Sequence, residues 1–214
     1  EGCLPIGAVL TIAAAGSEMS QSSVITNENG WVKRGYSSNY CRPVFAVMDP
    51  ELTMTLPPYQ TACGCVDILM HTMERYFNHS GSMEITDGIA EALMQTVIRN
   101  ALIVMQHPND YNARAEIMWA GSLSHNGLTD CGCDHGDWAT HKMEHELGGL
   151  FDVAHGAGLA AIWGSWARYV CDADYARFAR FATKVLNVAP QATDKETALA
   201  GIDAMEQFYH SIQM

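Results

Sequence analysis

The helical spacing of apolar residues from Pro57 to the C-terminus constrains the fold of this chain more than any other feature. The first helical pattern covers residues 57–77, where Val66, Leu69 and Met73 recur at three- and four-residue intervals behind a proline that suits a first turn. Further helical patterns cover residues 85–105, 113–126, 138–150, 156–170, 175–186 and 194–212. The sequence therefore predicts a mainly α protein with an all-helical body over residues 57–214.

Two of these helices have a short polar residue immediately before their first position. Asn112 precedes the helix predicted from residue 113, and Thr193 precedes the one predicted from residue 194. Such a side chain can accept a hydrogen bond from a free backbone N–H at the start of a helix, so both residues are predicted N-caps.

Residues 1–56 carry strand signals instead. Apolar runs at 8–13 and 43–48 predict two strands, and residues 23–26 and 31–36 flank the polar turn Asn27-Glu28-Asn29-Gly30 as a hairpin. A lead-in this small cannot form a sheet domain alone, because isolated hairpins are marginal in water. We therefore expect further sheet on its N-terminal side.

Charge and hydropathy exclude several classes of partner. The 214 residues include 12 Lys and Arg against 24 Asp and Glu, and the formal charge of −12 argues against nucleic acid. The longest apolar run, residues 8–15, is much shorter than a membrane helix, so no membrane segment is predicted. An acidic first residue, Pro5 and Gly7 argue against a secretory signal in the first fifteen residues.

The seven cysteines indicate a reducing compartment. Four of them form the Cys-Gly-Cys pairs Cys63/Cys65 and Cys131/Cys133, with one residue between the thiols where a zinc ribbon has two. An odd count also argues against a complete disulfide framework. We predict reduced thiols and a cytoplasmic protein.

Five residues stand out as a possible metal site. Asp67 and His71 are four positions apart on one predicted helix, so both lie on one face, and His141 and His145 repeat this spacing on another. His155 follows after a Gly-containing turn. An aspartate with several histidines is a reasonable ligand set for Zn²⁺ or Fe²⁺.

Other interpretations of these residues are open. Single histidines are often core or surface residues with a hydrogen-bond partner. The segment from His141 to His145 also fits the His-x-x-Glu-His pattern of inverted zinc peptidases, with Glu144 as the base. That pattern leaves Asp67, His71 and His155 without a role. A third interpretation is a non-catalytic, metal-binding helical fragment.

The sequence resembles the iron-containing, metal-dependent alcohol dehydrogenase family, in particular its butanol dehydrogenase and broad aldehyde reductase branch. The resemblance covers nearly the whole chain in the family's order. The matching segments are Leu10-Thr11 through Ala15-Gly16-Ser17-Glu18, Val44-Phe45-Ala46-Val47-Met48-Asp49-Pro50, Thr55-Leu56-Pro57-Pro58, Val66-Asp67 through His71-Thr72-Met73-Glu74, Asp137-Trp138-Ala139-Thr140-His141, and His141 through His155-Gly156.

The resemblance implies a dehydroquinate-synthase-like fold of two domains. Residues 1–56 would be the last strands and hairpin of an α/β nucleotide-binding domain, and residues 57–214 the all-helical metal-binding domain. The family's Gly-Gly-Gly-Ser pyrophosphate motif would lie before residue 1, and further helices would follow residue 214. On this basis the chain is expected to be a fragment.

The resemblance also assigns roles to individual residues. It implies that Asp67, His71, His141 and His155 bind the metal, and that His145 is a non-ligand catalytic histidine beside the nicotinamide that relays a proton. The positions that would contact the cofactor are Thr11, Ser20, Ser22, Val24 and Lys33, with Lys33 against its phosphates or ribose. Family sequences often have Thr where Ala15 stands, so no role is carried over to Ala15.

The expected activity is hydride transfer between NAD(H) or NADP(H) and a small aliphatic aldehyde or alcohol. Fe²⁺ or Zn²⁺ would polarise the substrate oxygen, and the cofactor would carry the hydride. Trp138, Phe151 and Trp163 are candidate walls of an apolar pocket, with ordinary core packing as the alternative. The family further suggests a homodimer or larger homo-oligomer.

Overall fold

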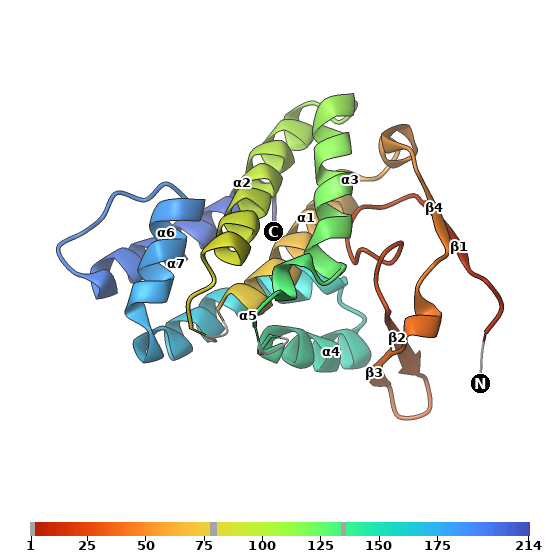
Figure 1. Cartoon of the computed structure of the whole chain (residues 1–214), viewed down its shortest axis with the longest axis horizontal. Coiled ribbons are helices and arrows are strands. Elements are labelled where there is room, and N and C mark those ends of the chain that lie inside the picture. The colour runs from red at the N-terminus through yellow and green to blue at the C-terminus, as the bar shows by residue number, and fades with distance from the viewer. Residues whose placement is uncertain (1–2, 78–80, 134–135) are drawn as a thin grey trace.

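A computed structural model describes residues 3–77, 81–133 and 136–214 of the chain. Helices dominate these residues, as the sequence predicts, and each predicted helix is present with boundaries shifted by a few residues at most (Figure 1). They are α1 Pro58–Tyr76, α2 Glu84–Gln106, α3 Tyr111–His125, α4 Ala139–Phe151, α5 His155–Val170, α6 Tyr175–Val185 and α7 Asp194–Ser211.

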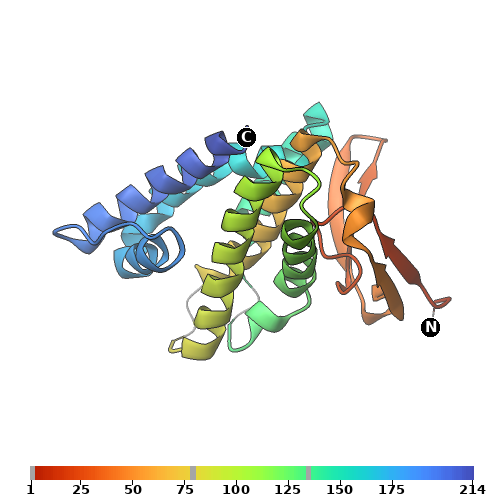
Figure 2. The same ribbon diagram turned by 90° about the horizontal axis from the view of Figure 1, so that it is seen from above.

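The lead-in forms two separate pairs of strands on one side of the helical body (Figure 2). Strand β1, Gly7–Leu10, runs parallel to β4, Phe45–Met48, and β2, Ser22–Asn27, pairs antiparallel with β3, Val32–Ser37. The β2–β3 pair confirms the predicted hairpin. Residues 1–2 of the predicted lead-in lie outside the described residues.

The first predicted strand is shorter than expected, because it ends at Leu10 and not at residue 13. The chain turns there toward α1. The Ala13 carbonyl then packs so closely on Gly64 that a Cβ on this glycine would lie 2.2 Å from the oxygen. A backbone contact with a helix thus replaces continued strand pairing.

Helix α1 is the centre of the helical body. Every residue from Thr61 to Tyr76 is buried, and the helix packs against α2, α3 and α5 (Figure 1). A helix that is buried on all sides normally carries only apolar residues. Asp67 and His71 are therefore unusual in α1, because any polar group there must find its partner inside the protein.

The helix starts test the two N-cap predictions. Thr193 caps α7 with a capping box, in which its side chain accepts from the Glu196 backbone N–H and the Glu196 side chain accepts from the Thr193 N–H. The Asn112 prediction is wrong. Asp110 caps α3 by accepting from Ala113 N at 2.9 Å, so the helix begins earlier and Asn112 lies in its first turn.

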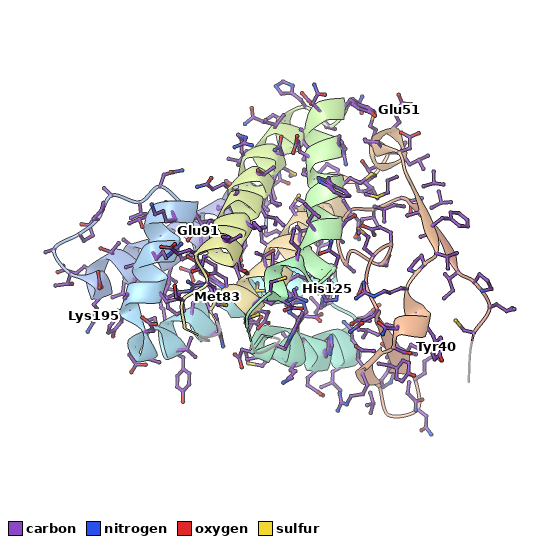
Figure 3. The ribbon with its side chains drawn as sticks, in the orientation of Figure 1. Tyr40, Glu51, Met83, Glu91, His125 and Lys195 are labelled. Atoms are coloured by element: carbon purple, nitrogen blue, oxygen red, sulfur yellow. The ribbon has the colours of Figure 1, made fainter. Side chains whose placement is uncertain are left out.

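Helix α2 has the length and hydropathy of a membrane-spanning helix. It packs, however, against α1, α3 and α6, and it carries the buried acidic residues Asp87 and Glu91. Arg177 of α6 donates to both oxygens of Asp87 at 2.7 and 2.5 Å, and Arg180 donates to Glu91 at 2.6 Å. Glu91, which is labelled in Figure 3, lies between α2 and α6. These ion pairs between helices are typical of a helix inside a folded protein.

Candidate metal centre

Helix α1 places Asp67 and His71 on one buried face, one turn apart. Asp67 is 4% exposed and His71 is 5% exposed. The Asp67 Oδ1 and His71 Nδ1 atoms are 3.6 Å apart, which is the proximity that the four-residue spacing predicts.

Helices α4 and α5 bring two further histidines to the same carboxylate oxygen. The His141 Nε2 atom lies 3.7 Å from Asp67 Oδ1, and the His155 Nε2 atom lies 3.5 Å from it. His155 is the first residue of α5. The next residue, Gly156, lies against the backbone of α1, where a Cβ would be 2.1 Å from the Cys63 carbonyl oxygen. This close approach directs the start of α5 toward Asp67.

The converging atoms are those that a cation would bind. Among the described residues, Asp67 Oδ1, His71 Nδ1 and His141 Nε2 are buried without a hydrogen-bond partner. Ligand atoms of these three residues lie within 4.8 Å of one another. Buried polar atoms without partners are costly, and a divalent ion would satisfy all of them. Imidazole nitrogens with one carboxylate oxygen suit Zn²⁺ or Fe²⁺.

The electrostatics of the cluster also favour a cation. Burial raises the pKa of Asp67, but His71, His155 and His141 outweigh it and hold this pKa well below its usual value. Burial lowers the pKa of His71 well below 6.5 and outweighs the opposing effect of Asp67. For His141, burial is outweighed by Asp67 and Glu74, which raise its pKa to about 9. A metal ion would replace that proton.

Glu74 orients one of the histidines and was not predicted as a site residue. Its Oε1 atom accepts from the His141 ring at Nδ1, 3.0 Å away, from the His141 backbone N–H at 3.1 Å, and from the Thr140 hydroxyl. Burial raises the pKa of Glu74, but these contacts lower it overall. The sequence could have indicated Glu74 as a site residue, because it follows Asp67 by two helical turns on the same face.

Three further side chains, His125, Trp138 and Arg75, pack around His71 and His141. The ring of His125, which Figure 3 labels at the end of α3, lies 4.1 Å from the ring of His71. Burial and the adjacent Arg75 lower the pKa of His125 to about 3, so this ring is neutral. Trp138 lies 5.1 Å from the His141 ring, with the Arg75 guanidinium over its face. No spacing in the sequence indicated His125, because its contacts come from helix packing.

His145 lies one turn after His141 on α4 and is partly exposed. Its ring is 5.9 Å from that of His155. Burial, followed by the charge of Lys33, lowers its pKa to about 4. The ring is therefore neutral near pH 7. It is His155, and not this second histidine of the peptidase pattern, that brings a ring nitrogen to 3.5 Å from Asp67 Oδ1.

The residues predicted to contact the cofactor lie along the lead-in. Thr11, Ser22 and Val24 are not buried, whereas Ser20 is buried and accepts from the Ser22 N–H at 3.0 Å. Lys33 is engaged within the protein: its Nζ atom lies 3.1 and 3.3 Å from the Glu144 carboxylate oxygens.

The three aromatic residues predicted as candidate pocket walls lie in different environments in the structure. Trp138 lies beside the histidine cluster. Trp163 is fully buried in the hydrophobic core, so its alternative interpretation as a core residue is correct. Phe151 is 70% exposed at the end of α4, and its side chain faces away from the core.

Comparisons with known proteins assign the family. The model of the C-terminal part of the Fe-containing alcohol dehydrogenase family matches residues 61–214, and the iron-containing alcohol dehydrogenase model matches residues 1–50. The chain belongs to the iron-containing alcohol dehydrogenase family. The resemblance in the sequence is thereby confirmed.

Within this family, several relatives are similar over almost the whole chain. A probable NADH-dependent butanol dehydrogenase of Bacillus subtilis is 39% identical over 99% of this chain and 54% of its own length. The NADPH-dependent aldehyde reductase YqhD of Escherichia coli is 34% identical over 99% and 54%. The crystal structure of NADH-dependent butanol dehydrogenase A from Thermotoga maritima superposes with a TM-score of 0.96 at 39% identity, covering 100% of this chain and 53% of that one. The chain thus spans about half the length of the relatives it matches.

Proposed function

We propose that this chain is the metal-binding catalytic part of an NAD(P)-dependent alcohol dehydrogenase that interconverts small aliphatic aldehydes and alcohols. The observation that carries the proposal is the convergence of unpartnered Asp67, His71 and His141 atoms in a member of this family. The printed names of the relatives, NADH-dependent butanol dehydrogenases and an NADPH-dependent aldehyde reductase, support this substrate class and a nicotinamide cofactor.

Asp67, His71, His141 and His155 would hold Fe²⁺ or Zn²⁺. When bound, such an ion supplies Lewis acidity to the oxygen of an aldehyde or alcohol, and the nicotinamide supplies or accepts the hydride. His155 is the most exposed of the four, with 31% of its side chain accessible, so the substrate would approach on its side. His145 lies on this side and would exchange the hydroxyl proton at a ring nitrogen.

The domain division is part of this proposal. Residues 1–56 would complete an α/β nucleotide-binding domain in a dehydroquinate-synthase-like arrangement, and residues 57–214 would be the metal domain. Strands β1 and β4 support this division, because the parallel pair exposes Val9, Phe45 and Val47, and parallel sheets normally have both faces covered. Thr11, Ser20, Ser22, Val24 and Lys33 would lie on the cofactor side.

Metal analysis of the full chain tests the proposal. We expect about one Fe²⁺ or Zn²⁺ per chain after reconstitution, and loss of that ion in Asp67→Ala and His141→Ala. His210→Ala, which changes an exposed histidine on α7, is the matched control and should retain the ion. Failure of the unmodified chain to bind either ion contradicts the proposal.

Turnover is a separate measurement. Oxidation of NADH or NADPH with butanal by the reconstituted chain would support the dehydrogenase assignment. Metal binding without any oxidation would favour the alternative of a non-catalytic metal-binding chain. Proteolysis that depends on Glu144 would favour the peptidase alternative.

We also propose a cytoplasmic location and a homodimer or larger homo-oligomer. Six cysteines are free thiols in the structure, which supports a reducing compartment: Cys3, Cys41, Cys63, Cys65, Cys131 and Cys171. The oligomeric state follows from the family resemblance alone. A mass measurement by light scattering tests it, and a monomer at micromolar concentration would contradict it.

A further inference from the structure

Glu144 is a fully buried carboxylate that joins the hairpin to the candidate metal centre. One of its oxygens contacts the Nδ1 atom of His155, and both oxygens contact the ammonium group of Lys33 on β3. We propose that Glu144 and Lys33 are positioning residues for the metal: Glu144 fixes the ring of His155, and Lys33 fixes Glu144. This inference rests on the proposed function.

His155 needs such a contact more than the other proposed ligands. Its side chain is 31% exposed, whereas those of His71 and His141 are only 6% and 7% exposed. Glu144 accepts a hydrogen bond from Nδ1–H of His155, which leaves Nε2 facing Asp67 Oδ1 at 3.5 Å. A carboxylate behind a histidine ligand fixes both the tautomer and the orientation of the ring.

The surroundings of Glu144 confine its carboxylate to this position. A Cβ on Gly158 would lie 2.8 Å from Glu144 Cγ, and a Cβ on Gly148 would lie 2.8 Å from both Glu144 Oε1 and Lys33 Nζ. Because any larger residue at these two positions would crowd the ion pair, Gly148 of α4 and Gly158 of α5 leave the space that the Glu144 side chain occupies. A shift of Lys33 would therefore move the Glu144 carboxylate and, with it, the ring of His155.

Lys33 supplies the charge that a buried carboxylate requires. Its side chain is 16% exposed and that of Glu144 is 0% exposed, so the pair is largely shielded from water. The two residues are 111 positions apart, and they meet because β3 packs on α4. The ammonium group of Lys33, which the resemblance assigns to the cofactor, thus contacts Glu144 beside the candidate metal centre. The position of the hairpin therefore influences the orientation of the His155 ring.

A second ion pair between the same two elements provides matched controls. Arg34 follows Lys33 on β3, Glu146 lies two residues after Glu144 on α4, and their charged groups are 2.9 Å apart. Their side chains are 63% and 60% exposed, and exposed pairs contribute little. Arg34→Met and Glu146→Gln therefore reproduce the charge changes of Lys33→Met and Glu144→Gln away from His155.

The test is titration of the metal-free full chain with Co²⁺, followed by the visible d–d absorption of the bound ion. We expect Lys33→Met and Glu144→Gln to weaken Co²⁺ binding about 10–100-fold and to change the d–d bands, which report ligand geometry. The double variant should lose no more than Glu144→Gln alone, since both residues act through one contact. Arg34→Met and Glu146→Gln should match the unmodified chain.

The outcomes separate this inference from the proposed function. No Co²⁺ binding by the unmodified chain overturns the proposed function. Normal binding by that chain, with unchanged affinity and spectrum in folded Lys33→Met and Glu144→Gln, overturns the positioning role alone. Equal losses in the Arg34 and Glu146 controls also overturn it. If Glu144→Gln does not fold, as judged by circular dichroism, Lys33→Met decides, because methionine retains the packing of the lysine stem.

Discussion

At the scale of single residues, the candidate site combines buried carboxylates with different roles. Asp67 presents an oxygen to three histidines, whereas Glu74 and Glu144 each accept from the far side of one histidine ring. This arrangement leaves the Nε2 atoms of His141 and His155 directed at Asp67. Each carboxylate is buried, so its removal should be measurable both in metal binding and in stability.

Replacing Glu74 tests the role of one of these buried carboxylates. Glu74→Gln removes the charge that accepts from Thr140 and from the backbone and ring of His141, and we expect the free energy of unfolding to fall by about 1–3 kcal/mol. Urea unfolding of the metal-free chain measures this change. The exposed Glu116→Gln on α3 is the control, and equal stability of the two variants would contradict the role of Glu74.

At the scale of elements, the site depends on how closely α5 approaches α1. A Cβ at Gly156 would lie 2.1 Å from the Cys63 oxygen and 2.6 Å from the Cys63 carbonyl carbon, all of them backbone atoms that cannot move without shifting a helix. Because His155 is the residue before this contact, the packing of two helices sets the distance from its ring to Asp67.

Two glycine replacements distinguish packing from helix propensity. We expect Gly156→Ala to lower the free energy of unfolding by about 1–3 kcal/mol and to weaken Co²⁺ binding, because α5 must move away from α1. Gly88→Ala on α2, where a Cβ would meet nothing within 4 Å, should stabilise the chain by about 0.5–1 kcal/mol. Thermal and urea unfolding measure both. A stabilised Gly156→Ala would contradict the contact.

The ion pairs between α6 and α2 allow a second test at this scale. Arg177→Met removes the bidentate partner of Asp87, in a pair whose side chains are 10% and 8% exposed, and we expect a loss of about 3–5 kcal/mol. Arg168→Met removes exposed contacts with Asp203 and Glu206 and should cost less than about 1 kcal/mol. Similar midpoints in urea for the two variants would contradict this ranking.

At the scale of the whole molecule, the candidate ligands come from α1 and from the consecutive helices α4 and α5, so a bound ion would connect two parts of the chain that are distant in sequence. Such an ion would bind the folded chain and not the unfolded one. Its effect on stability is then set by its concentration relative to the dissociation constant.

We therefore expect the chain to be more stable with metal than without. At a free Zn²⁺ concentration of about 100 times the dissociation constant, the free energy of unfolding should rise by about 2.7 kcal/mol. Differential scanning calorimetry with Zn²⁺ and with EDTA measures the shift. Asp67→Ala should show no shift, and an equal shift in that variant would place the ion elsewhere.

Much of the fold was predictable because its signals are local. Apolar spacing gave the helices, the turn at residues 27–30 gave the hairpin, and Thr193 gave a helix start. The end of the first strand was not predictable, because a contact between Ala13 and Gly64 sets it.

The sequence by itself determined that Asp67 and His71 share one helical face, because residues four apart must do so in a helix. Only the tertiary structure decided that His155 joins His141 beside this pair while His145 stays at the edge, and that Lys33 meets Glu144. Helical periodicity fixes the directions in which side chains point from one helix. The distance between elements depends on packing, such as the contact of Gly156 with Cys63, which no local pattern encodes.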